Sequence, residues 1–223
     1  PGRSPYRFYA LSNIGSLLAL LAYPFCIEVY LARGTQTLLW SWGMAAFAVM
    51  TAACAWRVWH APETRPPNPS PSAATADTRP GPRTVLLWFA LPACASAALM
   101  ATTNKLCQDM AVTPFLWVVP LSLYLLTFIL SFDNPRWYSR VLFGAALMPA
   151  IAAVAWAHFE GVELSMQKQV GIHCAALFVC CMVCHGELFR LRPDPRHLTG
   201  YYLAIASGGA IGGALVALVA PMV

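Results

Sequence analysis

Cysteine and histidine side chains, which are ligands of soft metals, gather in residues 179–186, VCCMVCHG. Cys181, Cys184 and His185 have the C-x-x-C-H spacing of a c-type haem attachment site. Haem is attached in that way outside the cytoplasm, whereas the charge pattern described below puts these residues near the cytoplasmic end of a helix. We therefore predict that the chain carries no covalent haem, and the sequence predicts no other cofactor.

A metal ion held without haem is the second interpretation of this segment. On a helix, Cys180 and Cys184 lie one turn apart, and His173 and Glu187 fall on the same stripe. His173 is about 16 Å along the axis from Cys184, so one ion cannot use the whole stripe. Cys180 and Cys184, with the neighbouring His185, could hold Cu(I) or zinc if another helix added ligands. The alternative is that the cysteines are small packing residues of an apolar helix.

The richest polar segment follows directly, HGELFRLRPDPRHLTGYY in residues 185–202. Its two prolines end the helix. One interpretation is a cytoplasmic loop in which Glu187 pairs with Arg190 or Arg192. The other is a gate, or a docking site for an acidic headgroup or partner. The candidate residues of this gate or docking loop are Glu187, Arg190, Arg192, Arg196 and His197.

Residues 207–214, SGGAIGGA, carry two overlapping G-x-x-x-G pairs, Gly208 with Gly212 and Gly209 with Gly213. Within an apolar run such pairs predict close packing between helices. A dinucleotide site is excluded, because the glycines lie inside an apolar run and no acidic residue follows.

The elements that must position these residues are membrane helices. The chain has 223 residues, of which 59% are hydrophobic and only 10% are charged, whereas soluble domains carry about 25% charge. The arginines are dispersed between apolar runs, which excludes a nucleic-acid-binding face. Seven runs are long enough to span a bilayer, and they predict an all-α bundle of about seven transmembrane helices: 8–31, 37–58, 84–103, 114–132, 141–159, 169–189 and 200–222.

Charge predicts the orientation of these seven spans. Of the 14 lysines and arginines, only Arg33, Lys105 and Lys168 fall on one side, which leaves 14 − 3 = 11 on the other. The positive side is the cytoplasmic one. The N-terminus is therefore predicted to be cytoplasmic, and the C-terminus lies outside.

A weak internal repeat predicts the domain organisation. IGSLLALLAYP in residues 14–24 aligns with IGGALVALVAP in residues 211–221, six helices later. That spacing is typical of transporters built from two six-helix halves. We expect two helices that end a first half in 1–60, a Pro-rich cytoplasmic linker in 61–83, and five helices of a second half in 84–223. Such a chain would be part of a longer protein.

Three stretches carry a resemblance to a known family: YALSNIGSLLALLAYPF (9–25), TPFLWVVPLSLYLLTFILSF (113–132) and the segment 183–221 that begins VCHGELF. They resemble the membrane part of bacterial fused major-facilitator/spermidine-synthase proteins. The resemblance implies a major-facilitator-like bundle in the bacterial inner membrane, often joined or adjacent to an aminopropyltransferase-like domain.

Three functions follow as expectations. The first is a transporter-like protein or the membrane partner of a synthase-like enzyme. The second is an accessory subunit of a larger energy-transducing membrane complex that contacts lipid, pigment or quinone. The third is a membrane metal or haem protein that uses the helix 173–187. No catalytic constellation is visible, so an enzyme is not expected. The expected partners are the lipid bilayer and either other membrane chains or the remainder of the same protein.

Overall fold

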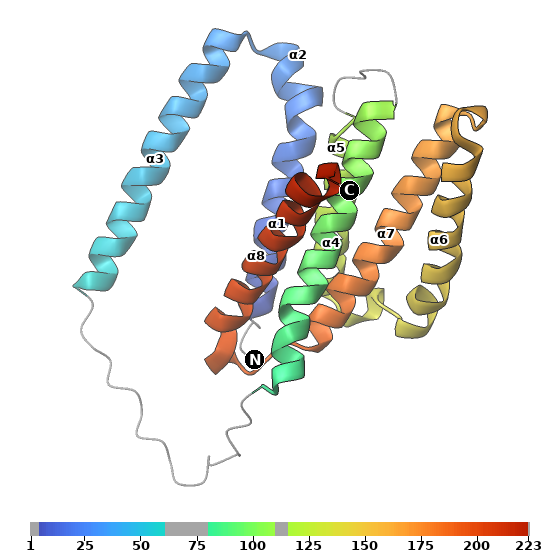
Figure 1. Ribbon diagram of the computed structural model, residues 1–223. Coiled ribbons are helices and arrows are strands. Elements are labelled where there is room, and N and C mark those ends of the chain that lie inside the picture. Colours follow the sequence, from blue (N-terminus) through green and yellow to red (C-terminus); the bar gives the residue numbers. More distant parts are fainter. Residues whose placement is uncertain (1–4, 61–79, 110–115, 223) are drawn as a thin grey trace. The chain divides into compact units, whose positions relative to one another are not determined.

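The computed structural model describes residues 5–60, 80–109 and 116–222, and every regular element among them is a helix (Figure 1). Within these residues the prediction of an all-helical chain is confirmed. The elements are α1 (Pro5–Ala22), η1 (Tyr23–Ile27), α2 (Glu28–Tyr30), α3 (Arg33–Trp59), α4 (Pro82–Asp109), α5 (Val118–Asp133), η3 (Pro135–Trp137), α6 (Arg140–Glu160), η4 (Gly161–Glu163), α7 (Met166–Arg190), η5 (Pro195–His197), α8 (Leu198–Ala214), η6 (Leu215–Val219) and η7 (Ala220–Met222).

Six helical stretches of the described chain are long and apolar enough to cross a membrane: Tyr9–Tyr30, Arg33–Trp59, Pro82–Cys107, Arg140–Glu160, Met166–Arg190 and Pro195–Val219. The remaining predicted span, 114–132, corresponds to α5, which has 16 residues. At 1.5 Å per residue α5 is about 24 Å long, less than the roughly 30 Å of a hydrocarbon core. The start of this predicted span, 114–115, lies outside the described residues.

The chain divides into two compact units, Pro1–Leu21 with Pro80–Val223 (unit 1) and Ala22–Arg79 (unit 2). Unit 1 contains α4 to α8 and nearly all of α1, whereas unit 2 contains η1, α2 and α3. The predicted division around a 61–83 linker stays a prediction, because residues 61–79 lie outside the described ones.

An aromatic core holds unit 1 together. Phe128 and Phe132, one turn apart on α5, stack with ring centroids 4.3 Å apart. Tyr9 of α1 lies 5.1 Å from Phe128 and stacks on Tyr202 of α8 at 4.6 Å. Phe189 of α7 meets Phe132 edge to face at 5.2 Å. Each such aromatic pair contributes about 0.5–1.5 kcal/mol of stability beyond the burial of its rings. This core therefore holds α1, α5, α7 and α8 against one another.

Contacts between helix ends show how the helices of unit 1 run. The Trp88 indole near the start of α4 donates a hydrogen bond of 3.0 Å to the Leu191 carbonyl, just after α7. Arg140, the first residue of α6, pairs with Glu187 near the end of α7 at 3.1 Å. These three helix ends therefore lie at one end of the unit, which we call the arginine end. Its arginines are Arg83, Arg136, Arg140, Arg190, Arg192 and Arg196.

α5 runs in the same direction as α7. Tyr124 early in α5 contacts the ring of His185 at a centroid distance of 4.9 Å, and Phe132 near its end contacts Phe189. α5 therefore returns the chain from the far end, which α4 approaches, to the arginine end, where α6 begins. A seventh membrane span would have to run in this direction, although α5 is short.

α3 is the most exposed helix of the described chain. It has 27 residues, and none of them is buried. Large apolar side chains such as Trp40, Trp42 and Phe47 are more than half exposed. An apolar surface of this kind needs apolar cover.

Candidate functional site

Three cysteine sulfurs converge between α4 and α7. The Sγ atoms of Cys94, Cys180 and Cys184 all lie within 4.8 Å of one another, and we call this group the thiol cluster. The two helices approach closely because Ala95, the next residue of α4, is fully buried and presents only a methyl group. Cys180 and Cys184 are one turn apart on α7, so both face α4. The arrangement brings two of the three predicted metal ligands together with a third thiol from another helix.

His185, the other predicted ligand, points to a different helix. Its Nδ1 lies 3.1 Å from the Thr127 hydroxyl of α5, and its ring packs against Tyr124 and Phe128. The imidazole is fully buried, and its Nε2 has no hydrogen-bond partner among the described residues. A step of one residue turns a helix by about 100°, which separates His185 from the face of Cys184. Cys181, the first cysteine of the C-x-x-C-H motif, is also fully buried.

Cys94 was missed by reasoning from the sequence. It is the only cysteine of the predicted span 84–103, and that span contains no histidine. The only available signal was the requirement that Cys180 and Cys184 receive further ligands from another helix. Which of the remaining cysteines meets that requirement depends on how α4 packs on α7.

An apolar cavity of about 220 Å³ adjoins the thiol cluster. It lies among α4, α6 and α7, and Cys180 belongs to its lining, with Ala98, Thr102, Leu147, Val154 and Leu177 among the others. Cys180 is partly exposed and Cys94 is exposed, whereas Cys184 is buried. Cys94 and Cys180 therefore lie at the surface of unit 1, and Cys184 lies beneath them.

A second candidate site lies at the arginine end. The Glu187 carboxylate accepts a hydrogen bond of 2.9 Å from the Tyr138 hydroxyl and pairs with Arg140 at 3.1 Å. Gly186 makes this possible, because any side chain at that position would occupy the place of the Tyr138 ring. The pKa of Tyr138 is raised above its ordinary value. The larger cause is the partial burial of the ring, and the second is the hydrogen bond that its hydroxyl donates to Glu187. Glu187 is thus held by partners from the α5–α6 connection and α6, not by Arg190 or Arg192.

Hydrogen bonds tie the end of α7 and the loop after it to α4 and α8. The Leu191 carbonyl accepts from Trp88, and the Leu188 carbonyl accepts a bond of 2.9 Å from the Tyr201 hydroxyl. The Asp194 side chain accepts from the Arg196 backbone amide at 3.2 Å, which caps η5. The other predicted members of the gate or docking loop lie here: Arg190, Arg192 and Arg196 are exposed, and His197 is half-buried.

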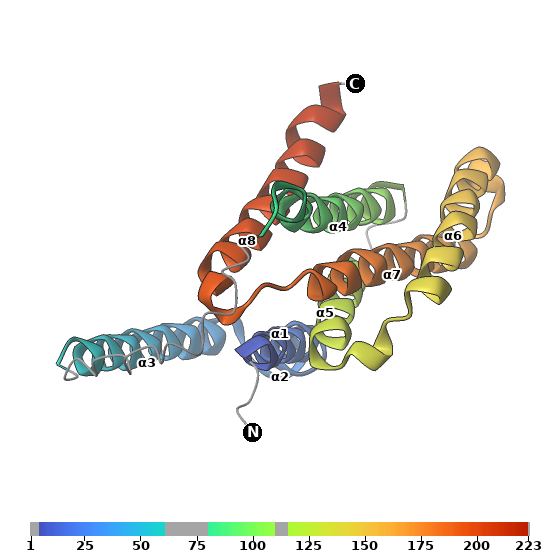
Figure 2. The same cartoon turned by 90° about the horizontal axis from the view of Figure 1, so that it is seen from below.

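The four predicted packing glycines do not behave alike. Gly208 and Gly212 are buried, and a Cβ on either would collide with α4 backbone, at Phe89 and Ala93 respectively. A Cβ on Gly209 would meet no atom within 4 Å, and one on Gly213 would meet only the Ser96 hydroxyl at 3.7 Å. Figure 2 shows α8 and α4 crossing side by side. The Gly208–Gly212 pair therefore sets how closely α8 approaches α4.

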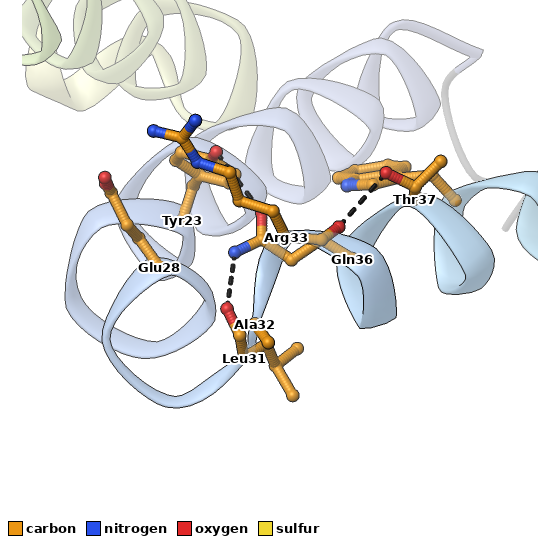
Figure 3. A pocket seen from close by; sticks show the side chains of 8 residues that line it. Tyr23, Glu28, Leu31, Ala32, Arg33, Gln36 and Thr37 are labelled. Atoms are coloured by element: carbon orange, nitrogen blue, oxygen red, sulfur yellow. Dashed lines mark hydrogen bonds between the residues drawn. The ribbon is translucent and has the colours of Figure 1, made fainter.

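Unit 2 has a polar pocket of about 650 Å³ at the turn between α2 and α3 (Figure 3). Gln36 organises it: its side-chain amide donates to the Leu31 carbonyl at 2.7 Å, and its oxygen accepts from the Tyr23 hydroxyl at 3.4 Å. Glu28 and Arg33 are also among the lining residues. These polar contacts close the turn and stabilise the hairpin of α2 and α3.

No protein-family model, no curated protein and no solved structure matches this chain. The class of protein therefore rests on the structure. Among the described residues, six helices are long and apolar enough to cross a membrane, and α3 exposes apolar side chains along its length, which makes this a multi-pass membrane protein of the helical-bundle class.

Proposed function

We propose that this chain is the membrane-embedded partner of a soluble synthase-like enzyme in a bacterial inner membrane, and that the loop after α7 docks that enzyme from the cytoplasm. The observation that carries the proposal is the ordered loop of residues 190–197 with its exposed guanidinium groups. The major-facilitator/spermidine-synthase resemblance adds the class of partner, an aminopropyltransferase-like protein, and the arginines of the loop require that its docking surface be acidic.

The loop has the properties of a prepared binding surface. The Trp88 and Asp194 hydrogen bonds hold its backbone, and the Tyr201 hydrogen bond holds the last turn of α7, from which the loop leaves. A surface that is already ordered loses less conformational entropy on binding. Arg190 and Arg196 are exposed on it, and arginine binds carboxylates through paired, planar hydrogen bonds.

The distribution of charge supports a cytoplasmic position for this loop. From α4 onward, unit 1 has six arginines at the arginine end, whereas Lys105 and Lys168 stand at the opposite ends of α4 and α7. Such an asymmetry is typical of the cytoplasmic side of a bacterial inner-membrane protein. It supports an N-terminus in the cytoplasm.

Transport is the second candidate, and one observation favours it. Tyr138, Arg140 and Glu187 join the start of α6 to the end of α7 at the arginine end. Breaking two polar contacts would allow these helix ends to separate, which is how a cytoplasmic gate in a transporter opens. In this interpretation residues 1–60 end the first half of a major-facilitator-like protein, and residues 84–223 supply five helices of its second half.

Purification from native membranes in mild detergent tests the docking function. The wild-type chain is compared with Arg190→Gln/Arg196→Gln and with a control of equal charge, Arg57→Gln/Arg83→Gln, which alters exposed arginines outside the loop. We expect an acidic, aminopropyltransferase-like protein to co-purify with the wild type and the control and to be lost from the loop variant.

Two results contradict the docking function. One is a wild-type chain that purifies from its native membranes without any soluble partner. The other is a soluble partner retained equally by all three proteins, because contact would then not involve the loop.

A further inference from the structure

We propose that the thiol cluster, Cys94, Cys180 and Cys184, is a binding site for monovalent copper. The inference is independent of the docking function, because the cluster lies between α4 and α7 and includes no residue of the loop. Copper enters and leaves as Cu(I) without a change of oxidation state. Bonds form between the ion and sulfur, thiol S–H bonds break, and the released protons pass to water.

The separation of the sulfurs fits one metal ion. A metal–sulfur bond of about 2.3 Å places the sulfurs of a trigonal site about 4 Å apart. In the structure they all lie within 4.8 Å of one another. Bringing the widest pair to that separation takes at most about 0.8 Å, a distance on the scale of small side-chain rotations.

The ligand set selects the metal. Thiolates are soft ligands, and soft ligands favour Cu(I) over hard cations such as Mg²⁺ and Ca²⁺. Zinc in structural sites takes four ligands, whereas this group offers three sulfurs and, among the described residues, no carboxylate or imidazole belongs to it. Three soft ligands without a fourth suit Cu(I), which does not need a tetrahedral shell.

Packing alone does not explain why these sulfurs meet. A cysteine that serves as a small hydrophobic residue is normally buried, and Cys181 behaves in this way. Cys94, in contrast, is exposed, and Cys180 is only partly covered. Two thiols that are not fully covered lie beside a buried third, and the cavity at Cys180 leaves space next to the sulfurs.

Copper titration of the purified full chain tests this site. The protein is reduced and kept without oxygen in detergent, and Cu(I) is added in competition with a chromophoric Cu(I) chelator. We expect one Cu(I) per chain and a sulfur-to-copper absorption band in the ultraviolet. Substitution of a second-shell residue already weakens metal sites by about 10–100-fold, so Cys94→Ser, which removes a direct ligand, should weaken binding at least tenfold.

The matched control is Cys174→Ser, which removes a thiol from α7 outside the cluster and should leave copper binding unchanged. Circular dichroism confirms that each variant remains helical, and Cys94→Ser is tolerated because the side chain is exposed. Equal copper affinity in wild type and Cys94→Ser overturns the proposal. Stoichiometric zinc binding in preference to copper, or a Cys94 disulfide that survives reduction, overturns it as well.

Discussion

A single methyl group at Gly212 should separate α8 from α4, whereas the same methyl group at Gly209 should not. A Cβ at Gly212 would lie 2.7 Å from the Ala93 carbonyl carbon and 2.8 Å from the Ala93 Cα, and carbon atoms prefer a separation of about 3.5–4.0 Å. Because the obstacle is backbone and not a flexible side chain, the two helices must move apart by about 1 Å. Overpacking of this kind costs about 1–3 kcal/mol.

Gly209→Ala is the matched control, since it makes the same chemical change three residues earlier on α8 and meets nothing within 4 Å. Replacing glycine by alanine within a helix contributes about 0.5–1 kcal/mol of stability, and this gain is common to both variants. Their difference in unfolding free energy is therefore the overpacking cost itself, about 1–3 kcal/mol. For a chain of this size each kcal/mol shifts the melting temperature by about 2–4 °C.

Thermal unfolding of both variants in the same detergent measures this difference. We expect Gly212→Ala to melt roughly 2–12 °C below Gly209→Ala. Equal melting temperatures would refute the reasoning, because they would mean that Gly212 does not set the distance between α8 and α4.

Four further predictions follow from the charge pattern, the Tyr138 site and the cysteines. A cysteine introduced by Ser70→Cys should resist an impermeant maleimide in intact cells and react after lysis; reaction in intact cells, above the wild-type background, would reverse the orientation. The folded-state pKa of Tyr138 is raised, so its contribution to stability is complete below pH about 10 and is lost as the pH rises through the folded pKa. The stability advantage of wild type over Tyr138→Phe should therefore shrink in alkaline solution, and a constant difference across that range would contradict the assignment. Gly186→Ala should displace the Tyr138 ring and raise hydrogen exchange at the start of α6, whereas the open position Gly171, changed to Ala, should not. A haem stain on a denaturing gel should be negative; a stain that is present in wild type and lost in Cys184→Ser would show covalent haem.

The helices could be predicted from sequence because their signal is local. An uninterrupted apolar run such as 37–58 has no alternative to a helix in a membrane, since every backbone group must be hydrogen-bonded within the segment, and α3 covers this run. The run 114–132 was less reliable, because the described helix there begins only at Val118. Length and hydropathy do not indicate where a helix begins.

The sites depended on information that no single segment contains. Sequence spacing placed Cys180 and Cys184 on one face of a helix, but it could not show that Cys94, 86 positions earlier, lies opposite them. It also predicted a partner for Glu187 among nearby arginines. The observed partners are Tyr138 and Arg140, from the connection before α6 and from α6 itself. Proximity along the chain is a poor guide once neighbouring helices bring other cations closer.

By itself, then, the sequence determined the class of protein, the helical segments and the end at which the arginines gather, because hydropathy and charge act on each segment separately. Only the tertiary structure decided which of two overlapping glycine pairs packs, which cysteines meet and which side chains hold Glu187. Each of these depends on the rotation of one helix about its axis relative to its neighbour. Ridges and small residues on both surfaces set that rotation together, so it is a property of the pair and is not encoded in either helix alone.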